Sequence, residues 1–357
     1  MDFQPIDKNT AIKEALDELD LISDYEAELL LRGLKPFATA ETQSFRAPMS
    51  PSEWLGRRQC NLVLVVYPEM ASTADFVEIA SKVKIIDPNI NPVVIVDRIE
   101  EDLALPSVPT LVVAPTMIKC LKHLPGRILC GMPLNKSQEY ERLNNRRIPV
   151  PRWSILTQSK KPDLSSFPDY VVCKPNLGGQ GAHVKIVKKN RVEWKPVVTQ
   201  ALGMSHEILV QEFIETGPRA IVYRVTTLFG RVLESHRFEG GCGLLSPTGK
   251  PYGGSHIVAS SKGAMVTLNY DEQVIQFGER AHQAFPEIPV LGVDIVREIK
   301  TGKLYVLEVN SIGYVWHFTS QTGKGIEMQI DMLLKNQFDA IARSAYILAE
   351  ATQRWAK

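Results

Sequence analysis

Short apolar runs and amphipathic stretches alternate along the chain from Asn61 onward. Four apolar, β-prone runs come first, at residues 62–67, 92–97, 110–114 and 127–131. Residues 74–83, between the first two runs, carry apolar side chains at helical spacing. Strands that alternate with helices indicate a parallel sheet covered on both faces, which predicts a small α/β domain over residues 59–133. No GxGxxG sequence follows its first strand, so the pattern does not favour a dinucleotide-binding domain.

The two ends of the chain have a different pattern. Residues 1–58 combine two stretches of helical spacing with a segment rich in Pro, Ser and Thr, which predicts an extension of helices and loops. After Ser320 the spacing predicts helices at residues 326–333 and 338–355. Together they make an expected C-terminal helical segment over residues 323–357.

The segment 171–187 holds an apolar run, a glycine-rich turn and a second apolar run. This order predicts a β-hairpin whose turn contains Gly178, Gly179 and Gly181. Backbone N–H groups in such a turn approach a ligand closely and can bind an anion, and Lys174 adds a positive charge beside them. The segment therefore suggests a flap over nucleotide phosphates. An ordinary glycine-rich hairpin with an exposed lysine is the alternative.

A second hairpin, at residues 291–313, carries acidic side chains. Glu308 and Asn310 are two residues apart, so on a strand both side chains point to the same face. Asp294 lies on the partner strand. Two carboxylates and an amide oxygen are hard ligands of the kind that Mg²⁺ binds together with phosphate oxygens and water. The alternative is a hairpin with polar residues on its solvated face.

Composition narrows the class of protein. The 357 residues are too many for one ordinary core, so two or three domains are expected. Lysine and arginine number 41 against 40 acidic residues, and this balance suggests no nucleic-acid partner. No signal peptide and no run of 18 apolar residues are found, so we expect a cytoplasmic protein without a membrane partner. The five dispersed cysteines show no metal-binding spacing. A homodimer is the commonest default oligomer.

The order of these motifs resembles the ATP-grasp superfamily of ATP-dependent ligases. Lys174 with its glycines precedes the acidic hairpin, as in that family. Residues 208–214 resemble the strand that ends in the adenine-binding hinge, and Arg224 stands where the family carries an arginine. Lys136 resembles the family's first ATP-contacting lysine. The resemblance implies an ATP-grasp fold, α/β and α+β, over residues 134–322, with the small parallel-sheet domain as its pre-ATP-grasp domain.

The resemblance also implies an activity and a site. The implied enzyme activates a carboxylate by phosphoryl transfer from ATP and joins it to an amine, forming a C–N bond with release of ADP. Its implied cofactors are ATP and Mg²⁺, with Mn²⁺ as a substitute. The implied site has catalytic residues Arg224 and Lys174, nucleotide-binding residues Lys136, Lys174, Gly178, Gly179, Gly181, Gln211, Glu212, Phe213 and Ile214, and metal ligands Asp294, Glu308 and Asn310.

Several points stay open at this level. The acid and amine could be an amino acid, a short peptide or a small natural-product acid, because specificity lies in loops that the sequence does not fix. Alternation along the strand allows only one of Gln211 and Glu212 to face the nucleotide. One or two metal ions fit the ligand set. A small-molecule kinase with the same fold, or a non-catalytic nucleotide-binding protein, are the alternative functions.

Overall fold

The computed structural model describes residues 58–96, 105–118, 124–178, 183–199, 203–217, 219–240, 264–313, 315–316, 318 and 320–357. Except for Arg58, the expected N-terminal extension lies outside these residues, as do Gly179 and Gly181.

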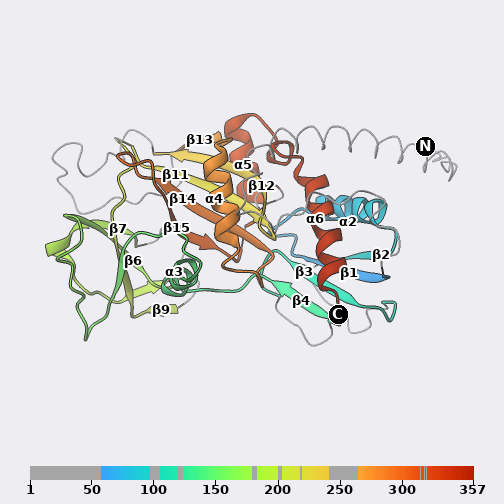
Figure 1. The fold of residues 1–357 in the computed structure, drawn as a ribbon, viewed down its shortest axis with the longest axis horizontal. Helices are drawn as coiled ribbons and strands as arrows, with labels where there is room; N and C mark the ends of the chain where they lie inside the picture. The colour runs from blue at the N-terminus through green and yellow to red at the C-terminus, as the bar shows by residue number, and fades with distance from the viewer. Residues whose placement is uncertain are drawn as a thin grey trace.

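A four-stranded parallel sheet forms the N-terminal part of the described chain. Its strands are β1 (Cys60–Val66), β2 (Ile90–Val96), β3 (Thr110–Ala114) and β4 (Arg127–Cys130), in the order β2-β1-β3-β4. Every neighbouring pair is parallel, which confirms the prediction. All seven residues of β1 are buried, as expected for a strand packed on both faces. Helix α2 (Thr73–Ile86) and the C-terminal helix α6 (Ala340–Trp355) pack together on one face (Figure 1).

A smaller antiparallel sheet lies at the opposite end of the long axis (Figure 1). Helix α3 (Lys136–Asn145) precedes it in the chain. Its strands are β5 (Trp153–Leu156), β6 (Tyr170–Pro175), β7 (Lys185–Lys188) and β10 (Ile208–Glu212), in the order β5-β10-β6-β7. β6 and β7 pair as the predicted hairpin. A short 3-10 helix, η3 (Lys189–Arg191), and the ribbon of β8 (Val197–Thr199) and β9 (Gly203–Ser205) complete this part.

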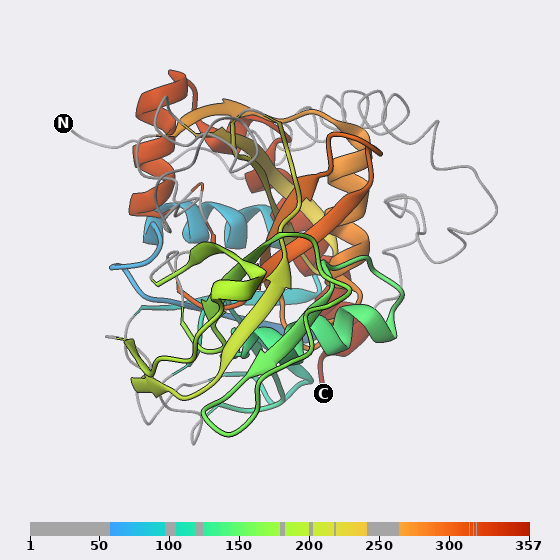
Figure 2. The same ribbon diagram turned by 90° about the vertical axis from the view of Figure 1, so that its left-hand side faces the viewer.

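The third part is a five-stranded antiparallel sheet. Its strands are β11 (Ile221–Leu228), β12 (Arg231–Glu239), β13 (Met265–Leu268), β14 (Val290–Arg297) and β15 (Leu304–Asn310), in the order β13-β12-β11-β14-β15. Helix α4 (Glu272–His282) packs on β11 and β14. β14 and β15 form the predicted acidic hairpin, with β15 at the edge of the sheet. Figure 2 shows the smaller sheet in front of this one, with β14 and β15 in orange behind it. The mixed α/β and α+β class is confirmed.

The C-terminal helices differ in their bounds from the prediction. Helix α5 spans Gln321–Ile330, so it starts and ends before the predicted 326–333. Ser320 explains the start, because its side chain accepts a hydrogen bond from the Gly323 N–H and caps the helix. A short 3-10 helix, η5 (Leu334–Asn336), follows, and α6 agrees closely with the predicted second helix.

Loops of the parallel sheet meet the chain directly after β15. The Gly313 N–H donates to the Thr116 hydroxyl at 3.2 Å, and the Ser311 hydroxyl donates to the Met132 carbonyl. A Cβ on Gly131 would lie 2.4 Å from the Ser311 carbonyl oxygen, so only glycine allows this approach. The carboxyl ends of β3 and β4 therefore lie beside the end of the acidic hairpin. Among the described residues, no helix combines the length and apolar character needed to cross a membrane.

His282, at the end of α4, is buried in the core beside β11. Its Nε2 lies 2.9 Å from the Ile288 carbonyl, and its Nδ1 lies 2.7 Å from the Thr227 hydroxyl. A neutral ring with its proton on Nε2 satisfies both contacts, because Nδ1 then accepts from the hydroxyl. Burial lowers the pKa of the His282 imidazole from 6.5 to about 4. The folded protein therefore holds this ring neutral at pH values where the unfolded chain protonates it.

We predict that His282 makes the fold acid-sensitive. Its depressed pKa contributes stability that is complete above about pH 6.5 and is lost as the pH falls toward 4, by at most about 3 kcal/mol. Urea unfolding between pH 7 and pH 4.5 measures this slope. The His282→Asn variant should be less stable at pH 7 and should show a shallower slope. The same substitution at the exposed His206 should leave the slope unchanged, and equal slopes in all three proteins would contradict the account.

Candidate functional site

Three ionisable side chains lie in a row across the large sheet. In the strand register, Arg224 on β11 is opposite Asp294 on β14, and Asp294 is opposite Glu308 on β15. Residues directly opposite each other in antiparallel strands point to the same face, so the register alone gathers these side chains. β14 and β15 are irregularly paired just after Asp294, where the register shifts. The sequence prediction that Asp294 and Glu308 lie together on one face is confirmed by this pairing.

Arg224 grips Asp294 with two parallel hydrogen bonds. Its Nε donates to Asp294 Oδ1, and one Nη donates to Oδ2 at 2.9 Å. Burial alone would lower the pKa of Arg224, but the contact with Asp294 reverses this effect and raises the pKa. Burial raises the pKa of the Asp294 carboxyl, whereas Arg224 acts against this shift, so the bidentate contact favours the ionised pair.

Asn310 completes the group on β15. Its Nδ2 lies 3.2 Å from the Gly292 carbonyl and 3.3 Å from Asp294 Oδ2. In this orientation the amide presents donors to Asp294. A turn of the amide plane by about 180° would exchange Nδ2 for the oxygen at the same position, which is what a metal ligand requires.

Lys136, on helix α3, approaches this row from outside the sheet. Asn135 caps the helix with a capping box that includes Gln138, so the first turn is well fixed. The Lys136 Nζ donates to the Gly178 carbonyl at 2.7 Å and lies 3.6 Å from Glu308 Oε2. The side chain thus joins the root of the predicted flap to an expected metal ligand.

Lys174, on β6, is also buried beside Glu308. Its Nζ donates to the Leu307 carbonyl at 2.8 Å and to the Tyr140 hydroxyl at 3.2 Å. Burial lowers the pKa of the Lys174 ammonium to about 8, although nearby carboxylates act in the opposite direction. Burial alone would raise the pKa of Glu308, but Lys136, Lys174 and Arg224 outweigh it and lower the pKa. Glu308 is therefore ionised at neutral pH.

The glycine turn is described only in part. Gly178 has a φ of 147°, a conformation that side-chain-bearing residues rarely adopt. The predicted anion-binding role of Gly178, Gly179 and Gly181 stays a prediction, because the latter two lie outside the described residues. The strands on either side of the turn pair as expected.

At the end of β10, the expected hinge, Gln211 and Glu212 point to opposite sides of the strand. Gln211 is 3% exposed, and its Oε1 lies 2.7 Å from the Tyr140 hydroxyl, on the side of Lys174. Glu212 points the other way, where it accepts hydrogen bonds from the backbone N–H and the guanidinium of Arg152. Ile214 packs with Val296 and Tyr305 in a small core. Phe213 is half-buried. Gln211, not Glu212, therefore points to the side of β10 that carries Lys174 and Tyr140.

Two site residues on α3 escaped the sequence prediction. The Glu139 carboxylate accepts a hydrogen bond from the Val309 N–H at 3.1 Å, and the Tyr140 hydroxyl lies 2.7 Å from the Leu307 carbonyl. Burial raises the pKa of Glu139 to about 7, while Lys136 acts against this shift. A signal for both was present in the sequence. With Lys136 and Leu143 they form an i, i+3, i+4, i+7 stripe, and a glutamate on such a buried stripe is unusual.

The candidate metal ligands fit Mg²⁺, which takes part of its coordination from phosphate and water, better than a metal ion that is held by protein side chains alone. Within the described ranges, no group of three or more His, Cys, Asp or Glu side chains could hold a metal ion. Asp294, Glu308 and Asn310 instead offer two carboxylates and one amide. Mg²⁺ is usually bound by one or two carboxylates together with substrate phosphates and water. Arg224 occupies both carboxylate oxygens of Asp294, so Asp294 can bind a metal ion only if Arg224 releases at least one of them.

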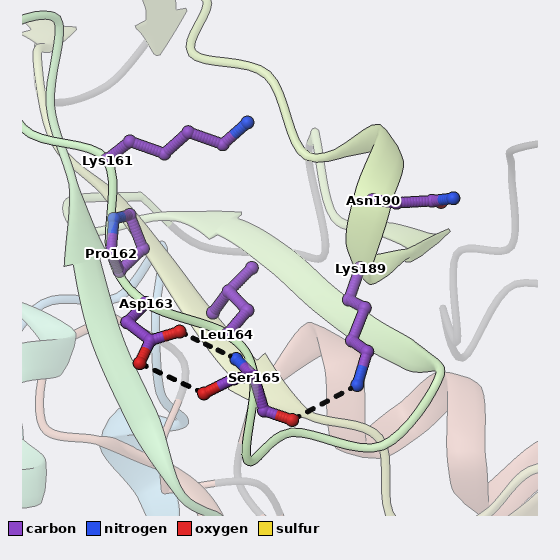
Figure 3. Close-up of a pocket in the computed structure, with 7 residues that line it drawn as sticks. All are labelled: Lys161, Pro162, Asp163, Leu164, Ser165, Lys189 and Asn190. Atoms are coloured by element: carbon purple, nitrogen blue, oxygen red, sulfur yellow. Dashed lines mark hydrogen bonds between the residues drawn. The ribbon is translucent and has the colours of Figure 1, made fainter.

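A shallow hollow of about 260 Å³ lies elsewhere, between the loop after β5 and η3 (Figure 3). Three of the polar residues that line it bond to one another. Asp163 accepts from the Ser165 N–H and hydroxyl, and Lys189 donates to the Ser165 carbonyl at 3.3 Å. These contacts hold the loop together. Arg224, Asp294 and Glu308 do not line the hollow. The site is therefore placed at β11, β14, β15, α3 and β6.

Several solved structures match this chain at low sequence identity. The D-alanine–D-alanine ligase of Bacillus anthracis is 15% identical, with 83% of this chain and 99% of that chain covered and a TM-score of 0.43. The D-cycloserine synthetase DcsG is 16% identical, with 82% and 99% covered and a TM-score of 0.48. The ATP-grasp ligase PsnB, complexed with the precursor peptide PsnA2 and AMPPNP, is 15% identical, with 80% and 98% covered and a TM-score of 0.46. No curated protein matches the chain.

A family model gives the assignment. Residues 134–311 match the model of an ATP-grasp domain. This segment begins just before α3 and ends directly after β15, so it contains every residue of the site described above. The chain therefore contains an ATP-grasp domain.

Proposed function

We propose that the protein is an ATP- and Mg²⁺-dependent ligase that joins a carboxylate to an amine through an acyl phosphate. One observation carries the proposal. Lys136 and Lys174 meet the row of Arg224, Asp294 and Glu308 in a single buried site within the ATP-grasp domain. Cations that can hold phosphates thus lie beside carboxylates that can hold their metal ion, as phosphoryl transfer requires.

Lys136 and Lys174 hold the phosphates of ATP in this proposal. Lys136 already contacts the flap root at Gly178, so closure of the flap and contact with phosphate would involve the same side chain. Lys174 is held by two oxygen acceptors, which aims its ammonium group. A flap closed over the phosphates would exclude water and so protect a reactive acyl phosphate from hydrolysis. The base of ATP lies at the end of β10, beside Gln211.

Asp294, Glu308 and Asn310 are the proposed metal ligands. Mg²⁺ held there would neutralise charge on the phosphates. A cation bound to Asp294 would compete with the Arg224 guanidinium for the same carboxylate oxygens. The planar fork of Arg224 matches either the transferring phosphoryl group or the substrate carboxylate, so we assign it to hold one of these anions.

The proposed reaction has two balanced steps. An oxygen of the substrate carboxylate bonds to the γ-phosphorus of ATP, and the bond from that phosphorus to the ADP oxygen breaks. The amine nitrogen then bonds to the acyl carbon, loses a proton, and inorganic phosphate leaves. The acid and amine belong to amino acids, short peptides or small natural-product acids.

The proposal predicts that ADP and inorganic phosphate form in equal amounts only when ATP, Mg²⁺, an acid and an amine are all present. Mass spectrometry of products from pooled amino acids and small acids, with a coupled ADP assay, measures this. The new product should have the mass of acid plus amine less one water. A phosphorylated product that accumulates without amine and without free phosphate would instead show a kinase.

Glu308 should be the most sensitive of the proposed metal ligands. We predict that Glu308→Gln, which keeps the shape but removes the charge, lowers kcat roughly 100-fold or more. Glu298→Gln, at the turn on the far end of the same hairpin, is the matched control and should keep wild-type activity. Circular dichroism checks that both variants fold. A loss of less than about threefold in the folded Glu308→Gln variant would remove Glu308 from the proposed ligand set.

Gly292 makes room for Arg224. A Cβ at Gly292 would lie 3.0 Å from Arg224 Nη1 and 3.2 Å from its Cδ, so the flexible side chain must shift. We predict that Gly292→Ala lowers kcat about tenfold, with the KM for ATP within about twofold of wild type, because phosphoryl transfer depends on position. Gly325→Ala on α5 is the control, since a Cβ there meets nothing within 4 Å. An unchanged kcat in Gly292→Ala would contradict the role of Arg224.

A further inference from the structure

β15 is an edge strand, so half of its backbone groups point away from the sheet. Two of these outward groups flank Glu308 in the chain, the carbonyl of Leu307 and the N–H of Val309. A buried backbone group without a hydrogen-bond partner is costly, so something other than a neighbouring strand must satisfy them. Helix α3 covers this edge of the strand.

Consecutive residues of α3 supply the partners. The Glu139 carboxylate accepts from the Val309 N–H at 3.1 Å, and the Tyr140 hydroxyl lies 2.7 Å from the Leu307 carbonyl. Both side chains are buried, with Glu139 only 4% exposed. The backbone is thus held on each side of Glu308 by the same helix.

The same helix also contacts the Glu308 side chain. Lys136, one turn before Glu139, lies 3.6 Å from Glu308 Oε2. The start of α3 is in turn tied to the end of β6, because the Lys136 N–H donates to the Asn176 carbonyl at 2.9 Å. Three points of contact therefore fix Glu308 relative to α3, and two of them act through the backbone of its neighbours Leu307 and Val309.

We propose that Glu139 is a positioning residue that sets Glu308 for metal binding, and this rests on the function proposed above. The carboxylate of Glu139 acts through the Val309 N–H and touches neither substrate nor metal. Its length matters, because a side chain shorter by one methylene cannot reach the same N–H from the same helix position. Its charge matters less, because an amide oxygen in its place accepts the same hydrogen bond.

Three variants and one control separate position from charge. Glu139→Ala removes the acceptor, Glu139→Asp keeps the charge but shortens the reach, and Glu139→Gln keeps the acceptor without the charge. Glu141→Ala removes an exposed carboxylate from the same helix and is the matched control. Calorimetry measures the Kd of ADP twice for each protein, once with excess Mg²⁺ and once with EDTA. Thermal melting confirms that each variant is folded.

The Kd measured with Mg²⁺ should rise about tenfold in Glu139→Ala and Glu139→Asp, as expected when support of a metal ligand is lost. The Kd measured with EDTA should stay within about twofold. Glu139→Gln should bind within about threefold of wild type in both conditions, and Glu141→Ala should match wild type. If Glu139→Ala fails to fold, Glu139→Asp carries the test.

Two results would overturn the inference. Equal weakening with Mg²⁺ and with EDTA would give Glu139 a general structural role, and an unchanged Kd in the folded Glu139→Asp variant would remove the positioning role. A wild-type protein that binds ADP in neither condition has a different meaning, because it overturns the proposed function itself.

Discussion

Opposite charges held out of water at the edge of β15 are the constraint on which the site depends. Lys136, Lys174 and Arg224 face Asp294 and Glu308, and burial opposes the charged form of each group whose pKa it shifts. Such a group of charges is stable only while every member keeps its partners, since removal of one leaves another uncompensated. The free-energy cost of burying these charges is offset by hydrogen bonds such as the bidentate contact of Arg224 with Asp294. In the proposed function, a metal ion and phosphates would therefore enter by exchange with these contacts.

Much of the fold was readable from local pattern. The apolar runs gave the parallel sheet, and both hairpins formed where alternation and glycine turns predicted them. Lys174 and Glu308 were identified because a charged residue within an apolar strand is a strong local signal. The convergence of Asp294 and Glu308 followed from strand register, which a hairpin with a short turn largely fixes.

The features that the sequence did not predict depend on contacts between segments that are distant in sequence. Glu139 became part of the site because α3 lies against β15, and no property of either segment alone specifies that contact. The direction of Gln211 was open for the same reason. Gln211 and Glu212 place a polar side chain on each face of β10, and only the contact of Gln211 with Tyr140, on a different segment, shows which face lies toward Lys174. The packing of α6 beside α2 is also a long-range contact, because it brings the C-terminal helix onto the N-terminal parallel sheet.

The most direct test of the central claim is the position of a metal ion in crystals grown with ADP and Mn²⁺ in place of Mg²⁺. Anomalous scattering locates Mn²⁺ without reference to the protein density. The account predicts a peak at about 2.1 Å from oxygens of Glu308 and Asp294, with a phosphate oxygen of ADP completing the coordination. A peak remote from β14 and β15, or nucleotide bound with Arg224 still gripping both oxygens of Asp294 and no metal beside them, would contradict it.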